Sequence, residues 1–308
     1  MIDTAASLSR FKRKTPRRVI WQRQGLAFLF LAPGLILFLL MIWYPTVQTV
    51  LFSFQNVGLT GSKGWVGLNN FDRMLGDPQF IIAWRNSIVF VLLSLLMGLA
   101  VPIVLALMIN EMRRFASVFQ LIVYLPALIP SAVGLLIWRL IYQPEQTGIL
   151  NSLLKLIGLP PQLWLSDPNL AKPLIIIIMT WLGAGGSTLI YLSALREIPV
   201  EFLEAAELDG FSPFQRVWYV VLPLISSRIQ IMLVLQIIIV AQVFTEPFIL
   251  TQGGPASATM TPVLEIYNAA FVNSDFGLAS AWSVSMLVVL SIFSVIYVWL
   301  RREDTGMN

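Results

Sequence analysis

The chain has 308 residues, of which 57% are hydrophobic and only 12% are charged, and its mean hydropathy is +0.79. Soluble domains carry about a quarter charged residues, so this composition indicates an integral membrane protein. The absence of cysteine and histidine excludes thiol nucleophiles, disulfides, imidazole catalysis and the usual zinc and haem ligand sets. We therefore predict no catalytic residue and no metal site.

The first 24 residues are polar and basic, and residues 25–50 are then almost entirely apolar. A basic segment before an apolar run is also typical of a cleaved signal peptide. No small-x-small cleavage site follows here, because Trp43, Tyr44 and Pro45 come next. We predict a cytoplasmic N-terminus at 1–24 and a retained transmembrane helix at 25–50, with both aromatic residues at the outer interface.

Residues 51–85 are rich in glycine and predict an extracytoplasmic loop without regular elements. Gly61-Ser62-Lys63-Gly64 lacks the spacing of a phosphate-binding loop, so no ATP site is visible. A second polar loop at 143–171 includes a short amphipathic segment around 149–157.

Five further apolar segments, within a permease core at 86–302, are each long enough at about 1.5 Å per residue to span a bilayer. They cover residues 86–110, 116–138, 174–195, 229–249 and 278–300. Pro126 and Pro130 predict that the second of these is kinked and buried in a bundle. Gly183, Gly185 and Gly186 predict close helix contact in the third.

The polar stretch 198–223 predicts two short helices with a sharp break. Pro199 suits a first turn, Gly210 suits a left-handed helix end, and Ser212 with Gln215 forms a capping-box pattern. We expect Leu222-Pro223 to end the second helix. The first helix has an acidic and an apolar face, formed by Glu201, Glu204 and Glu207 and by Phe202, Leu203 and Ala206. A connector resting on the membrane surface would have the same pattern.

The residue identities favour a more specific interpretation. Glu204-Ala205-Ala206, then Asp209-Gly210, then Leu222-Pro223, resembles the cytoplasmic "EAA" loop of permease subunits in ATP-binding-cassette (ABC) importers. Two residues depart mildly from the family pattern, Val220 in place of isoleucine and Phe211 in place of alanine. The resemblance implies that this loop docks on an ATPase subunit through Glu204, Ala205, Ala206, Asp209, Gly210, Phe211, Leu222 and Pro223.

Thr251-Gln252-Gly253-Gly254-Pro255, followed by an aromatic loop, resembles the sugar-permease branch of the same importers. The resemblance implies an all-α, six-span, MetI-like fold with a cytoplasmic coupling loop. It also implies a second permease subunit, two ATPase subunits that bind ATP and Mg²⁺, and an extracytoplasmic solute-binding protein. We expect no cofactor on this chain, no nucleic-acid partner, and contact with membrane lipid.

The basic residues predict the orientation in the membrane. Fourteen of the 20 lie on the side that would hold both termini, including the tail at 303–308, and the 198–223 loop. The positive-inside rule places that side in the cytoplasm. The resemblance to ABC importers implies that the membrane is the plasma (inner) membrane of a bacterial or archaeal cell.

A few polar and aromatic residues within the apolar segments are candidates for the substrate path. Gln236, Gln242 and Glu246 are polar groups at membrane depth, and such groups usually face an interior path. Gln242 and Glu246 are four residues apart and would share a helix face. Trp181 and Tyr191 could stack on sugar rings, although interface anchoring or bundle packing is the more usual role of such aromatic residues. For Glu246 the alternative is a simple interfacial charge.

We interpret the chain as the permease subunit of an importer for a sugar, an oligosaccharide or a glycerol-phosphate-like polyol. An ion-coupled secondary transporter is the main alternative, and an intramembrane enzyme a weaker one. The first would need intramembrane acids or broken helices at its site, and the second would need clustered acids.

Overall fold

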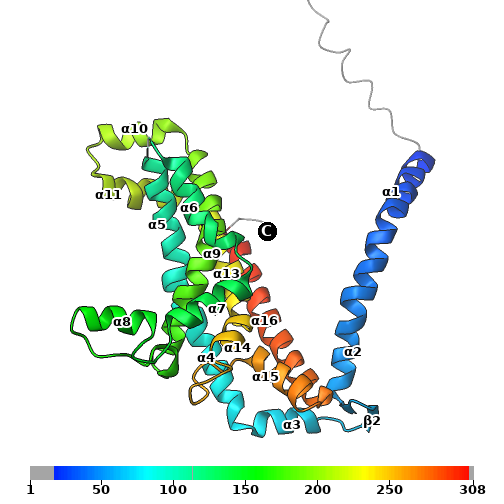
Figure 1. The fold of residues 1–308 in the computed structure, drawn as a ribbon. Coiled ribbons are helices and arrows are strands. Elements are labelled where there is room, and N and C mark those ends of the chain that lie inside the picture. Colours follow the sequence, from blue (N-terminus) through cyan, green and yellow to red (C-terminus); the bar gives the residue numbers. More distant parts are fainter. Residues whose placement is uncertain (1–16, 113, 305–308) are drawn as a thin grey trace, which may run out of the picture.

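The computed structural model describes residues 17–112 and 114–304, which form a helical bundle with one helical arm beside it (Figure 1). Most of the predicted N-terminal segment and tail, together with Arg113, therefore lies outside the described residues. Four continuous apolar helices are long enough to span a membrane, and two bent pairs complete six spans. The continuous helices are Phe28–Ser53, Pro78–Glu111, Ala171–Arg196 and Phe276–Trp299.

The arm consists of α1 (Arg17–Phe38), the π-helical turn η1 (Leu39–Trp43) and α2 (Tyr44–Ser53). The predicted first span falls within this arm. Its large apolar side chains from Phe28 to Tyr44 are exposed, because only α2 packs against the bundle, on the last helix α16 (Phe276–Asp304). An unbroken apolar surface of this kind is stable only against lipid or protein.

The segment at 51–85 is more ordered than its glycines predict, so the expectation of an irregular loop was wrong. An antiparallel hairpin of β1 (Gln55–Gly58) and β2 (Gly61–Trp65) precedes α3 (Asn69–Gly76). The glycine at 61 has φ +91°, which makes the turn possible. Buried Asn70 donates hydrogen bonds to the carbonyls of Ser53 and Gln55 and so fixes the hairpin to the foot of the arm.

The core of the bundle surrounds α9 (Ala171–Arg196). Its neighbours include α4 (Pro78–Ser94), the turn η2 (Leu95–Leu99) and α5 (Ala100–Glu111). Close helix contact occurs as predicted at Gly185, where an added Cβ would lie 2.6 Å from the carbonyl oxygen of Val123. The other two glycines, at 183 and 186, have open space beside them.

Both remaining spans are broken. The predicted kink at 126–130 is a 94° bend between α6 (Ala116–Leu128) and α7 (Ser131–Ile141), because Ile129 precedes a proline and adopts an extended conformation. The other bend, of 72°, separates Pro213–Leu224 from α13 (Ser226–Ala241). The helix thus ends at Leu224, one residue beyond the predicted Leu222-Pro223. Leu222 itself is helical and follows the π-helical turn η4 (Val217–Val221), so the break comes at Ile225 and not at the residue before the proline.

The other elements are short and connect the spans. Figure 1 places α10 and α11 at one end, called the α10 end, and α3 with the hairpin at the opposite end, called the α3 end, while α8 projects sideways. These elements are α8 (Ile149–Leu156), η3 (Trp164–Ser166), α10 (Val200–Leu208), α11 (Pro213–Arg216), α12 (Leu222–Leu224), α14 (Thr245–Leu250), α15 (Pro262–Tyr267) and η5 (Asn268–Val272).

Candidate functional site

The α10 end presents the two predicted short helices. Pro199 precedes the first turn of α10, and the helix ends at Leu208, followed by Asp209 as its C-cap and Gly210 at φ +78°. The backbone N–H of Phe211 then donates to the carbonyl of Ala206 at 3.0 Å, which closes the turn. The predicted capping box of Ser212 and Gln215 begins α11. Sequence alone therefore located this hairpin and its turn.

The faces of α10 divide differently from the prediction. Ala206 is buried and Leu203 is half-buried against the bundle, but Phe202 is exposed together with Glu201 and Glu204. Leu208 is 90% exposed and projects at the tip of the helix. Leu208 was not among the predicted contact residues, because its exposure depends on which face of α10 packs against the bundle.

Glu207 is exposed, but it is paired within the chain. It pairs with Arg216 of α11, whose guanidinium also lies 3.5 Å from Glu111 at the end of α5. The Arg216 side chain is only 19% exposed, so it is shielded where it joins three helices. One of the three acids of the predicted acidic face thus fixes α10 to the bundle.

A second candidate site is a cavity of about 340 Å³ inside the bundle, between η2, α7, α9, α13 and α14. Its lining includes hydroxyl groups of Ser94, Ser131, Thr180 and Ser187, the amide of Gln236 and the carboxyl group of Glu246. Among the described residues that line it, Glu246 is the only charged one. Hydroxyl, amide and carboxylate groups in an apolar bundle are suited to hydrogen bonding a polar, uncharged solute.

Two of the five residues predicted for the substrate path, Gln236 and Glu246, meet at this cavity. Gln242 does not share a face with Glu246, because the chain breaks between α13 and α14. It lines a different cavity, against α16. The prediction that Gln242 and Glu246 share a helix face was therefore wrong, because the four-residue spacing applies only within a continuous helix.

The two predicted aromatic contacts lie elsewhere. Tyr191 is 1% exposed and belongs to the core cluster near the α10 end, and it does not line the cavity. Trp181 packs edge-on against Trp138, with ring centroids 5.6 Å apart. Both residues therefore have the packed surroundings that the alternative interpretation predicted.

Residues 251–259, which include the Thr-x-Gly-Gly-Pro sequence, fold into a compact loop. The hydroxyl groups of Thr251 and Thr259 are 2.6 Å apart, and Thr259 donates to the carbonyl of Gly254. Lys172, at the start of α9, donates to the carbonyl of Ala258 at 2.7 Å and to Asn86. These contacts hold the loop against α4 and against the first turn of α9.

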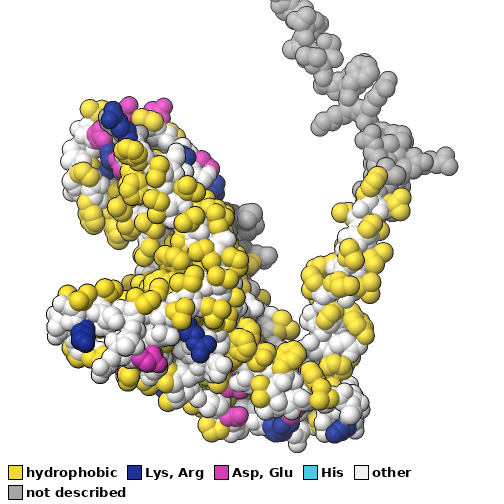
Figure 2. Space-filling model, in the orientation of Figure 1, with side chains coloured by type: hydrophobic (Ala, Val, Ile, Leu, Met, Phe, Trp, Pro, Cys, Tyr) yellow, Lys and Arg dark blue, Asp and Glu magenta, His cyan; other side chains and the backbone are white. Residues whose placement is uncertain are grey.

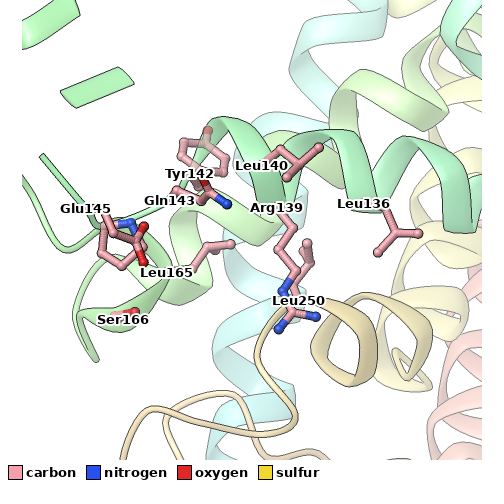
Figure 3. A pocket seen from close by; sticks show the side chains of 10 residues that line it. Leu136, Arg139, Leu140, Tyr142, Gln143, Glu145, Leu165, Ser166 and Leu250 are labelled. Atoms are coloured by element: carbon pink, nitrogen blue, oxygen red, sulfur yellow. The ribbon is translucent and has the colours of Figure 1, made fainter. Parts of the chain in front are cut away.

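Another cavity, of about 450 Å³, opens beside this loop between α7 and the chain around η3 (Figure 3). Arg139 projects from α7 toward Leu250, and its guanidinium donates to the carbonyl of Ile249 at 3.2 Å. Glu145 and Ser166 lie at the opposite side of the opening. In the described part of the chain, no group of three or more acidic residues could hold a metal ion, and the expectation of no cofactor stays a prediction.

Six apolar spans, a cavity among them with several polar groups in its lining, and an exposed helical hairpin at one end are the features of a membrane permease. The family model for the binding-protein-dependent transport system inner membrane component matches residues 98–303. The chain belongs to this family, and it is a transmembrane permease subunit of an ABC importer.

Relatives match over nearly the whole chain. The probable ABC transporter permease YurN of Bacillus subtilis is 31% identical over 89% of this chain and 95% of its own length. The arabinooligosaccharide permease AraP of the same organism is 28% identical, covering 94% and 93%. A solved bacterial alginate ABC transporter, in complex with an alginate-bound periplasmic protein, contains a chain with TM-score 0.83 and 28% identity, covering 92% and 96%.

Proposed function

We propose that this permease forms the path for a sugar or oligosaccharide, with the 340 Å³ cavity as its solute contact inside the membrane. The observation that carries this proposal is the lining of hydroxyl, amide and carboxyl groups around Gln236 and Glu246. A sugar offers many hydroxyl donors and acceptors, which such groups can pair. Relatives named for arabinooligosaccharides, trehalose/maltose and lactose support the substrate class.

The same proposal includes the partners. A second permease subunit would complete the path, and a solute-binding protein would load it at the α3 end. Two ATPase subunits would bind ATP and Mg²⁺ and hydrolyse ATP, so this chain would carry no catalytic residue. The α10 end and both termini would then lie in the cytoplasm, in agreement with the distribution of basic residues.

Coupling would occur through α10. The exposed positions Glu204, Ala205, Asp209 and Gly210 would contact the ATPase, and Leu208 would add an apolar anchor. Exposed ion pairs contribute only about 0–1 kcal/mol each, so apolar contacts would supply much of the affinity. Because Arg216 on α11 pairs with Glu207 of α10 and lies beside Glu111 of α5, a push on α10 would reach the span that ends in α5 and the bent span that begins with α11.

Solute-stimulated ATP hydrolysis by the reconstituted importer tests this function. The assembly would contain both permeases, the ATPases and the loaded binding protein in proteoliposomes. We expect Glu204→Lys and Gly210→Val to abolish stimulation in complexes that still assemble by pull-down, because the first reverses a contact charge and the second strains a left-handed residue. Lys155→Glu, a charge reversal on the exposed polar face of α8, serves as the control. Unchanged stimulation in both variants would reduce the hairpin to a surface connector.

A further inference from the structure

The short helix α8 has an exposed apolar stripe that the bundle does not use. Ile149, Leu153, Leu156 and Ile157 follow helical spacing, and their exposed fractions are 53%, 53%, 81% and 70%. The face that packs inward is a different one, with Leu150, Asn151 and Leu154. A third sector, with Ser152 and Lys155, is exposed and polar. The helix therefore has a packed face, a water-facing face and an apolar face without a partner in this chain.

The segment that carries the stripe is rigidly built. Asn151 is 2% exposed, and its amide donates to the carbonyls of Pro144, Glu145 and Gln162. Its side-chain oxygen accepts from the backbone of Gln162 and from the indole of Trp164 at 2.8 Å. The two amide hydrogens are shared among the three carbonyls, and these contacts close residues 143–170, the α8 lobe, into one unit. The exposure of the stripe is thus a fixed feature of the lobe.

The position of the lobe indicates what covers the stripe. Figure 1 shows α8 projecting from the side of the bundle, about level with α7 and at a large angle to the long helices α9 and α16. In Figure 2, hydrophobic side chains follow the edge of this lobe that faces the α10 end, which is the edge toward the apolar belt of the spans. Exposed Leu136 and Leu140 on neighbouring α7 bring further apolar surface to the same level. Charged Arg139 and Glu145 border the opening between α7 and the lobe.

We propose that α8 lies in the outer leaflet of the membrane, with this stripe at the boundary between headgroups and acyl chains. An amphipathic helix with a separate polar sector is suited to that position. The lobe would then rest on lipid and hold Glu145 and Ser166 in place at the mouth of the 450 Å³ cavity. The inference does not depend on the identity of the solute.

Site-specific fluorescence quenching tests the proposal, because the chain contains no cysteine and accepts a single label. Leu156→Cys and Ser152→Cys would each carry an NBD fluorophore in the importer complex, reconstituted in phosphatidylcholine vesicles. The two positions share one helix and are both exposed, so they form a matched pair. We expect doxyl-labelled lipid to quench the label at 156 severalfold more strongly than the label at 152, and aqueous iodide to do the reverse.

Two results would overturn the proposal. Strong iodide quenching at 156 would show that the stripe faces water. Protection of position 156 from both quenchers would show that protein covers it, and protection that arises only after addition of the binding protein would identify that protein as the partner.

Discussion

The side-chain amide of Gln236 lies directly over Gly98. A Cβ added at Gly98 would come within 2.5 Å of Gln236 Nε2, and both residues line the interior cavity. The glycine belongs to the π-helical turn η2, so the missing side chain and the widened turn together make room for the amide. The absence of a side chain at Gly98 thus determines where the amide of Gln236 on α13 lies.

Gly98→Val should push Gln236 out of its position and narrow the cavity. The far end of a flexible side chain can move at little cost, so we expect the importer complex to assemble normally. Solute uptake should fall severalfold, and Gly186→Ala, beside open space, is the control. Uptake at the normal level in Gly98→Val would contradict a solute contact at Gln236.

Glu246→Gln should weaken solute transport without loss of assembly. The substitution replaces a carboxyl oxygen by an amide NH₂, and the loss of one hydrogen bond of about 1 kcal/mol corresponds to about a fivefold change in affinity. Glu246→Lys should reduce transport further, because it replaces a hydrogen-bond acceptor with a cation that can only donate. Initial uptake rates at several solute concentrations measure the effect. An unchanged concentration dependence in both variants would place the solute elsewhere.

Arg216→Gln should loosen α10 while the fold remains. Both its carboxylate partners are more than half exposed, so the loss in unfolding free energy is about 0–1 kcal/mol. We expect solute-stimulated ATP hydrolysis to drop severalfold in complexes that still assemble. Arg196→Gln provides a control, because Arg196 forms no ion pair among the described residues. Full stimulation in Arg216→Gln would mean that α10 needs no tether to α5.

Gly185→Leu should destabilise the protein at the crossing of α6 and α9. The new side chain would meet the backbone of Val123 and Tyr124 at 2.6–2.7 Å, and backbone cannot move aside as a side chain can. Overpacking of this kind costs about 1–3 kcal/mol, so we expect a clearly lower melting temperature in detergent. Gly186→Leu, its neighbour beside open space, should melt near the wild-type temperature. Equal melting of the two variants would refute the close approach.

Glu265, on α15 outside the spans, should make stability depend on pH. Burial, and secondly the nearby Asp77 carboxylate, raises the pKa of Glu265 from 4.5 to about 7. Because the folded state favours the protonated acid, this contribution to stability is present in full below pH 4.5 and is lost as the pH rises through about 7. Glu265→Gln should therefore melt at a higher temperature than wild type at pH 8, with little difference at pH 4.5. Parallel melting curves for the two proteins across this range would rule out the effect.

Local sequence signals were sufficient for several elements. Six apolar segments, the α10–α11 hairpin, the left-handed Gly210 and the capping box of Ser212 with Gln215 were all predicted, because hydrophobicity, capping and glycine conformations depend on neighbouring residues. The hairpin at 55–65 was missed, since a buried amide 15 or more residues away, Asn70, fixes it.

Only the tertiary structure decided which polar residues meet. Gln236 and Glu246 converge on one cavity because α13 breaks before α14, whereas helical spacing wrongly paired Glu246 with Gln242. Likewise, Glu207 resembles Glu201 and Glu204 in sequence but is paired with Arg216. Hydropathy and capping act over a few residues and are readable along the chain. The partners of a polar side chain depend on bends and packing between distant helices, and these appear only when the chain is folded.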